Sequence, residues 1–311
     1  MKKFLFSLLL TFIAAPVLAD EPLKLGVLLI EDSVPFYLAE KEQFYVDEKL
    51  EVELVPFLSA LERDSALTAG AIDGAITDPV GALLFDKGRG AIKITSLCLG
   101  ETPAEGIFAI LAAPKSGITT LEELKNVEIA VSNATIIEYV TDRLLEDQGF
   151  KPEEIKKIEV KKMPIRMQML LSGSVKAATL PEPLASIAAG KGASLLITDA
   201  SSQESLSQTV IVFRSEVLTD RKAEIARFFK AYKRSIEAIN KDPEKYRSLF
   251  VEKGRIPPFL AEQYIIPTYP VPAPFSKSLY APVSQWLTAK NLVEAVPYES
   301  MVATDFMDDL N

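Results

Sequence analysis

The sequence contains no histidine and only one cysteine among its 311 residues. Without histidine the chain lacks the base of Ser-His and Cys-His nucleophiles and the usual zinc and copper ligand. The single Cys98 excludes an internal disulfide, and its neighbours Ile94, Leu97 and Leu99 indicate a small buried side chain. We therefore predict a protein that is not an enzyme, with no catalytic residue, bound metal or cofactor.

Phosphate-binding and calcium-binding sequence patterns are also missing. The chain has neither GxGxxG nor GxxxxGK[ST], and Gly88-Arg89-Gly90 is typical of a surface turn. The formal charge is −9, and it becomes more negative by two without Lys2 and Lys3. Such a surface does not attract nucleic acid or an anionic membrane, so we expect neither as a partner.

The first 19 residues have the pattern of a secretory signal peptide. Lys2 and Lys3 precede an apolar run from Phe4 to Ala15, and Val17-Leu18-Ala19 resembles a cleavage site. The run is too short for a stable membrane span, and no cysteine follows the cleavage site to carry a lipid. We expect a soluble, monomeric mature protein that begins near Asp20 and is located in the periplasm.

The mature chain shows the same order of elements twice. Apolar or alternating runs predict strands at 23–30, 50–57 and 72–77 and helices at 36–44 and 60–69; the second copy has strands at 127–131, 158–160 and 175–180 and helices at 136–148 and 165–172. The order β-α-β-α-β favours parallel strands. We predict an α/β protein of two lobes, each built on a doubly wound, mainly parallel sheet.

The two copies also share the pattern R-x3-L-x2-G-x-[I/V]-x2-A. It begins at Arg63 in the first copy and at Arg166 in the second. Because both arginines fall on predicted amphipathic helices, we expect them to be solvated side chains.

Two apolar strands are expected to connect the lobes. Residues 107–113 would leave the first lobe and 209–213 would return to it, which makes a two-crossing hinge. We place the first lobe at 20–112 and 207–311 and the second lobe at 113–206. A helix over 221–240 and a proline-rich connector over 254–282 follow.

The candidate binding residues follow from the rule that such sheets bind ligands at the carboxyl ends of their strands. The loop Ser132-Asn133-Ala134-Thr135 opens a helix, whose free N–H groups favour an anionic group. Ser132 or Thr135 could equally serve only as a helix cap. We expect ligand contacts from these side chains: Ser33, Phe36, Ser59, Asp78, Ser132, Asn133, Thr135 and Glu182.

Two acidic side chains occupy equivalent places in the two copies. Asp78 and Glu182 each follow the third strand of their copy and precede or flank a proline. A carboxylate there would accept from an amine or ring N–H, whereas the alternative role is to cap the next helix. Together with an apolar face from Phe36, this favours a zwitterion or heterocycle as ligand.

Three segments carry a resemblance to a known family: SVPFYLAEKEQFY (33–45), ELVPFLSALERDSALTAGAIDGAITD (53–78) and LPEPLA (180–185). They resemble the substrate-binding proteins of bacterial ABC importers, in the sulfonate/taurine/nitrate group with its thiamine-pyrimidine-type relatives. The resemblance implies a type II periplasmic-binding fold that closes on a small molecule and docks on a membrane permease. Ser33, Ser59, Asp78 and the 132–135 helix start match the binding loops of that family.

Two other readings stay open beside the importer receptor. One is an enzyme of the same fold, such as a menaquinone-pathway lyase or a pyrimidine synthase. The leader argues against both, and the absence of histidine argues against the synthase, which uses an active-site histidine. The other is a receptor that presents its ligand to a sensor protein.

Overall fold

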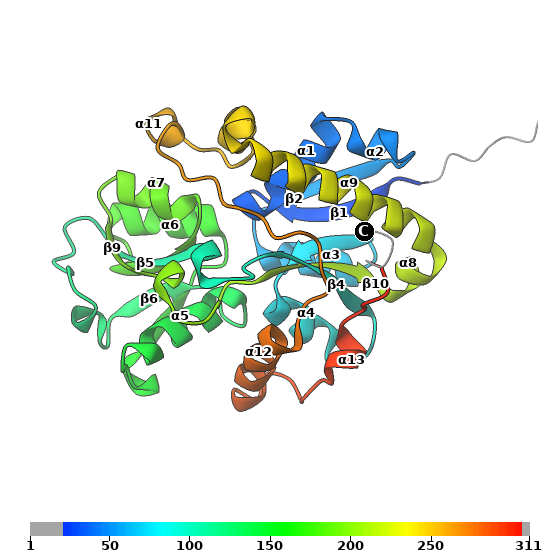
Figure 1. Cartoon of the computed structure of the whole chain (residues 1–311). Coiled ribbons are helices and arrows are strands. Elements are labelled where there is room, and N and C mark those ends of the chain that lie inside the picture. Colours follow the sequence, from blue (N-terminus) through cyan, green and yellow to red (C-terminus); the bar gives the residue numbers. More distant parts are fainter. Residues whose placement is uncertain (1–20, 307–311) are drawn as a thin grey trace, which may run out of the picture.

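The computed structural model describes residues 21–306, so the predicted signal peptide lies outside the described residues. Two α/β lobes lie side by side, and the chain passes between them more than once (Figure 1). This confirms the predicted two-lobed α/β architecture. Within residues 21–306 no helix is long and apolar enough to cross a membrane.

The first lobe is built on a five-stranded mixed sheet with the order β2-β1-β3-β10-β4. Its strands are β1 (Leu23–Leu28), β2 (Val52–Phe57), β3 (Gly74–Thr77), β4 (Ile92–Leu99) and β10 (Thr209–Arg214). β1 pairs in parallel with β2 and β3, whereas β10 runs antiparallel to β3 and β4. The parallel pairs are therefore confined to the three strands that form the predicted repeat.

The second sheet repeats this design with the order β7-β6-β8-β5-β9. Its strands are β5 (Phe108–Ala112), β6 (Glu128–Val131), β7 (Lys156–Glu159), β8 (Ala177–Pro181) and β9 (Ser194–Thr198). β5 runs antiparallel to β8 and β9 and takes the place that β10 has in the first sheet. Each sheet thus contains one reversed strand that the chain contributes as it crosses between the lobes.

The position of β5 corrects one expectation. We expected residues 108–112 to end the first lobe, but their pairing with β8 and β9 puts them in the second sheet. All five residues are buried, so their apolar character fits a central strand of either sheet. The crossing therefore lies before Phe108, and the return crossing precedes β10 as expected.

Helices cover the faces of both sheets. In the first lobe and the C-terminal region they are α1 (Val34–Lys41), α2 (Phe44–Asp47), α3 (Ala60–Thr68), α4 (Pro79–Asp86), α8 (Ser215–Asp220), α9 (Lys222–Lys241), α10 (Arg247–Lys253), α11 (Pro258–Ala261), α12 (Lys277–Ala289) and α13 (Tyr298–Met301). In the second lobe they are α5 (Ile136–Asp147), α6 (Met163–Ser172) and α7 (Leu184–Gly190).

Local signals set several helix ends where the sequence predicts them. The Ser59 hydroxyl accepts from the Glu62 amide at 3.3 Å and caps α3. Gly173 ends α6 with a φ of 76°, a left-handed conformation in which glycine carries little strain. The last described helix, α13, ends at Met301.

The C-terminal region connects the two lobes a third time. α12 packs against α4 of the first lobe. Near its end, the Trp286 indole donates to Asp142 of α5 at 3.3 Å, and Lys290 pairs with the same carboxylate at 2.6 Å. α12 therefore bridges from the first lobe to the second.

Candidate functional site

A small cavity of about 40 Å³ lies between the lobes at the carboxyl ends of the central strands. Its walls are Leu28, Ile30, Asp32, Ala60, Arg63, Thr77 and Asp78 of the first lobe, Ile107, Phe108 and Thr209 at the crossings, and Ser132, Thr135, Ile136, Ile137, Lys161, Met163 and Pro181 of the second lobe. This volume has room for water but not for an organic ligand. The structure therefore shows the lobes closed together.

Two buried carboxylates dominate the wall of the first lobe. Asp78 caps α4 by accepting from the Gly81 amide at 2.7 Å, and Asp32 accepts from the Ser33 hydroxyl at 2.9 Å. Burial raises the pKa of each carboxyl to about 6, and the Arg63 guanidinium opposes that rise. The capping role expected as an alternative for Asp78 is present together with its place in the cavity wall.

Arg63 is the cation of this wall, and its charge is matched within the lobe. It pairs with Asp64 at 2.7 Å and also donates to the Thr77 hydroxyl. With Asp32, Asp78 and Asp64 around one arginine, the first-lobe wall carries more acid than base. It suits a hydrogen-bond donor or a cation.

The wall of the second lobe is built around the start of α5. The Thr135 hydroxyl accepts from the Ile137 amide at 3.2 Å and donates to the Ser132 carbonyl at 2.7 Å. The Ser132 hydroxyl donates to the Lys161 carbonyl at 3.1 Å and accepts from Arg166 at 2.9 Å. Together with the positive end of the α5 dipole, this wall suits an acceptor or an anion.

Arg166 lies behind Ser132 and is completely buried. Its guanidinium donates to the carbonyls of Val160 and Thr179 as well as to Ser132. Burial lowers its pKa to about 10. Arg63 is almost as deeply buried. The expectation that both arginines are solvated is therefore wrong, because each side chain turns inward under the strand ends of its own lobe.

Three of the predicted site residues meet at the cavity: Asp78, Ser132 and Thr135. Ser33 and Ser59 are buried beside the wall and do not line it, while Asn133 is exposed. Asn133 lies in the turn before α5, and its side chain faces solvent. The predicted loops thus border the cavity, but only some of their side chains point inward.

Phe36 does not face the cavity. It is completely buried and stacks on Tyr232 of α9, with ring centroids 4.5 Å apart. The first helical turn of α1 directs it into the core of the first lobe. The predicted contact between Phe36 and a ligand is not supported by this packing.

Glu182 belongs to a second acidic group at the hinge side of the cleft. Its carboxylate accepts from the amide and hydroxyl of Ser186 at 3.1 and 2.9 Å. Glu31 receives a hydrogen bond from the Tyr264 hydroxyl, and Asp199 accepts from the Phe108 amide at 2.9 Å. Burial, reinforced by Glu182, Asp32 and Asp199, raises the pKa of Glu31 to about 8 against the opposing Tyr264 hydrogen bond.

Sequence reasoning missed five polar wall residues: Asp32, Arg63, Thr77, Lys161 and Thr209. Asp32 lies in a loop that was identified, and the repeated arginine pattern pointed to Arg63 and Arg166 as equivalent positions. Nothing in the local sequence marks Lys161 or Thr209, because they reach the cavity through the pairing of distant segments.

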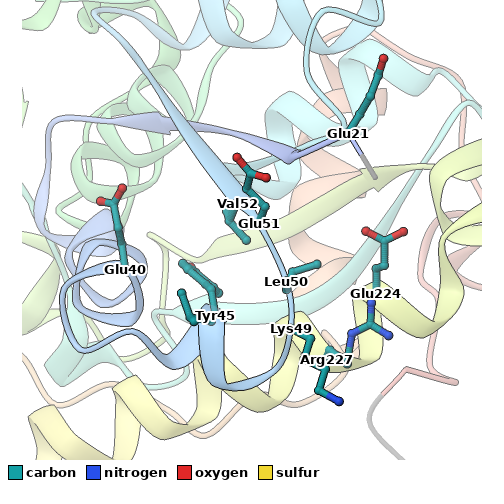
Figure 2. A pocket seen from close by; sticks show the side chains of 10 residues that line it. Glu21, Glu40, Tyr45, Lys49, Leu50, Glu51, Val52, Glu224 and Arg227 are labelled. Carbon is teal, nitrogen blue, oxygen red and sulfur yellow. The ribbon is translucent and has the colours of Figure 1, made fainter. Parts of the chain in front are cut away.

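A larger hollow of about 550 Å³ lies elsewhere, on the outer edge of the first lobe. Figure 2 shows Glu40, Tyr45 and Glu51 on one side of it and Glu224 and Arg227 of α9 on the other. All of its walls belong to the first-lobe body, so closure of the lobes does not enclose it. The interlobe cavity is therefore the better candidate for a ligand site.

The side chains of residues 21–306 give no support for a metal site. Across the described range, 21–306, no group of three or more Cys, Asp or Glu side chains is placed to hold a metal ion. The acidic side chains of the cleft instead bind hydrogen-bond donors of the protein or face the cavity.

Comparison with solved structures identifies the fold. The ligand-binding component of an ABC-type import system from Staphylococcus aureus, with zinc bound, superposes with a TM-score of 0.81 and 19% identity, over 94% of this chain and 99% of that one. The alkanesulfonate-binding protein SsuA from Xanthomonas axonopodis pv. citri, bound to MOPS, gives 0.76 and 17%, over 91% and 99%. The nitrate-binding protein NrtA from Synechocystis PCC 6803 gives 0.69 and 12%, over 94% and 99%.

These structures are similar in fold and remote in sequence, and no curated protein sequence matches the chain. All three have the periplasmic-binding architecture that the resemblance to importer substrate-binding proteins implies. The model of the NMT1/THI5-like family matches residues 31–246, which include both repeated units except for β1 and the cavity wall except for Leu28 and Ile30. The chain belongs to the NMT1/THI5-like family.

Proposed function

We propose that the protein is the solute-binding receptor of an ABC importer and that its lobes close on one small polar molecule. The observation that carries this proposal is a cavity that residues of both lobes and of both crossings line. A site divided in this way is complete only when the lobes come together. The leader pattern supports a periplasmic location, and the similar structures support a membrane permease as partner. We propose that the receptor is a monomer.

The two walls indicate a ligand with two unlike ends. Asp32 and Asp78 would accept from an amine or ring N–H, while Ser132, Thr135 and the start of α5 would donate to an acidic or strongly accepting group. A zwitterion or a polar heterocycle has both ends. Because the chain as a whole is acidic, affinity for the anionic end must come from this local wall.

Opening must precede binding because the closed cavity is too small for such a molecule. We propose that residues 21–106 with 207–306 move as one body and 107–206 as the other. The hinge then lies at the two crossings and at the contact between α12 and α5. A ligand that contacts both walls stabilises the closed form, by about 2.7 kcal/mol at a hundredfold excess over its Kd.

The observations do not favour an enzyme. Cys98, the only thiol, is completely buried, and burial raises its pKa to about 12. A thiol in that state does not supply a thiolate nucleophile. The Ser132 hydroxyl contacts a carbonyl and a guanidinium, and neither group can take its proton.

The single tryptophan offers a direct test. Trp286 is held between α12 and α5 by its bond to Asp142 and by the edge of Tyr139, so its surroundings change when the lobes separate. A library of polar metabolites is screened for a change in Trp286 emission. Hits are then tested by calorimetry and by small-angle scattering, where we expect compaction.

Matched variants give the control. Asp32→Asn should weaken binding of a hit at least tenfold, whereas Asp47→Asn, an exposed position far from the cavity, should not. Trp286→Phe should lose the optical signal but keep the calorimetric one. Hits that bind without compaction, and with equal affinity to both aspartate variants, would contradict the receptor proposal.

A further inference from the structure

Arg166 is a buried cation without a counter-ion. Among residues 21–306 no carboxylate lies within ion-pair distance of it, and the four hydrogen bonds that its guanidinium donates go to the carbonyls of Val160 and Thr179 and to the Ser132 hydroxyl. Its hydrogen bonds are made, but its charge is not neutralised. Buried charges are normally paired, because removal from water disfavours the ionised form.

The equivalent arginine of the first lobe, Arg63, has a counter-ion. Arg63 occupies the same place in the repeated pattern and is paired with Asp64 at 2.7 Å. At the position after Arg166 the second copy has Met167, which carries no charge. The two halves of the protein thus share one arginine position, and only the first half supplies its acid.

Two buried acids of the second lobe, Glu138 and Asp142, are already engaged with other partners. Glu138 accepts from the Ala134 amide and pairs with Lys157 and Lys290 at 2.7 and 3.0 Å. Asp142 pairs with the same two lysines, both at 2.6 Å. These contacts hold both carboxylates in the network with α12, away from Arg166.

Ser132 connects the unpaired charge to the cavity. Its hydroxyl accepts from Arg166 at 2.9 Å and is itself a cavity wall. The hydroxyl proton now points to the Lys161 carbonyl, but it can rotate toward a group in the cavity while the oxygen keeps its bond to Arg166. A cation behind the oxygen makes that hydroxyl a stronger donor.

We propose that the anionic group of the ligand is the missing counter-ion of Arg166, held through the Ser132 hydroxyl and the first turn of α5. This inference rests on the proposed function and extends it. Arg166 is then a positioning residue that selects a carboxylate, sulfonate or similar anion over a neutral group of the same shape. The ligand therefore has a fixed direction, with its anionic end at the second lobe and its donor end at Asp32 and Asp78.

The first test supplies the counter-ion from the chain and needs no ligand. Ser132→Asp and Ser132→Asn place side chains of the same shape at the cavity, with and without a charge. If Arg166 lacks a counter-ion, Ser132→Asp should melt a few degrees above Ser132→Asn at pH 7. Because Arg166 would lower the pKa of the new carboxyl below its usual 3.9, this advantage should persist at pH 5 and vanish near pH 2.

Arg166→Gln provides the cross-check, since in that background the advantage of Asp over Asn should disappear. Should Arg166→Gln fail to fold, the pH dependence of the two Ser132 variants still decides the matter. A Ser132→Asp protein that melts at or below Ser132→Asn at pH 7 overturns the inference and leaves the receptor proposal untouched.

The second test uses methanesulfonate as the anionic probe and dimethyl sulfone as its neutral counterpart, at constant ionic strength. Methanesulfonate should raise the melting temperature of the wild type more than dimethyl sulfone does, and this difference should be absent in Ser132→Asp. Arg234→Gln, at an exposed position, should behave as the wild type. If methanesulfonate and dimethyl sulfone change the melting temperature by the same amount in the wild type, and also in Ser132→Asp, the inference is overturned.

Discussion

Glu31 is expected to make the unfolding free energy fall as the pH rises through neutrality. Burial raises the pKa of its carboxyl from 4.5 to about 8 in the folded protein. Between these two values the folded chain holds a proton that the unfolded chain has released. The contribution of Glu31 to the unfolding free energy is fully present below pH 4.5, declines as the pH rises and is lost above about pH 8.

The size of the effect follows from the shift. Between pH 6.5 and 8.5 the loss is about 2 kcal/mol, since one pKa unit corresponds to about 1.36 kcal/mol. Histidine and thiol groups do not titrate between pH 6.5 and 8.5 in this protein, because the chain has no histidine and burial raises the pKa of Cys98 to about 12. The groups that face Glu31 are Tyr264, Glu182, Asp32 and Asp199, and burial raises the pKa values of the two aspartates only to about 6, below this pH range.

Glu31→Gln isolates this contribution because the amide keeps an acceptor for the Tyr264 hydroxyl and cannot ionise. Urea unfolding at half-unit intervals from pH 6.5 to 8.5 should show the decline in the wild type and a much shallower profile in Glu31→Gln. Glu294→Gln, at an exposed position, should follow the wild type. Parallel profiles for the wild type and Glu31→Gln would refute the reasoning.

Three further predictions concern the core, the contact between the lobes and the thiol. Phe228→Ala should lower the unfolding free energy by roughly 3–5 kcal/mol in urea titrations, because Phe228 lies at the centre of a cluster of aromatic rings. The rings that it contacts are those of Phe36, Tyr45, Phe213, Phe229 and Tyr232. The control Val46→Ala, at an exposed position, should change the unfolding free energy by less than about 0.5 kcal/mol. Asp142→Asn should weaken the bonds that hold α12 to α5 through Lys157, Lys290 and Trp286. Small-angle scattering should then show a larger radius of the unliganded protein, and Trp286 emission should shift to the red. An unchanged radius and spectrum would contradict the bridging role of α12. Cys98 should react with a thiol reagent only in denaturant, and rapid labelling of the native protein would contradict its burial.

Much of the fold was accessible from the sequence because its signals are local. The strand runs, the cap at Ser59 and the glycine after α6 depend on residues a few positions apart, and the structure confirms them. Repetition of these signals was enough to predict two similar α/β lobes. The sheet to which β5 belongs was not accessible, because a uniformly buried strand carries no mark of its partners.

The candidate site could also be predicted from the sequence only in part. The sequence placed the right loops at the strand ends and identified Asp78, Ser132 and Thr135, since the carboxyl end of a strand and the start of a helix are fixed by local order. It did not determine that Phe36 turns into the core, that Asn133 faces solvent, or that Arg63 and Arg166 are buried. The direction of those side chains and the missing partner of Arg166 depend on which distant segments pack around them, and only the tertiary structure brings those segments together.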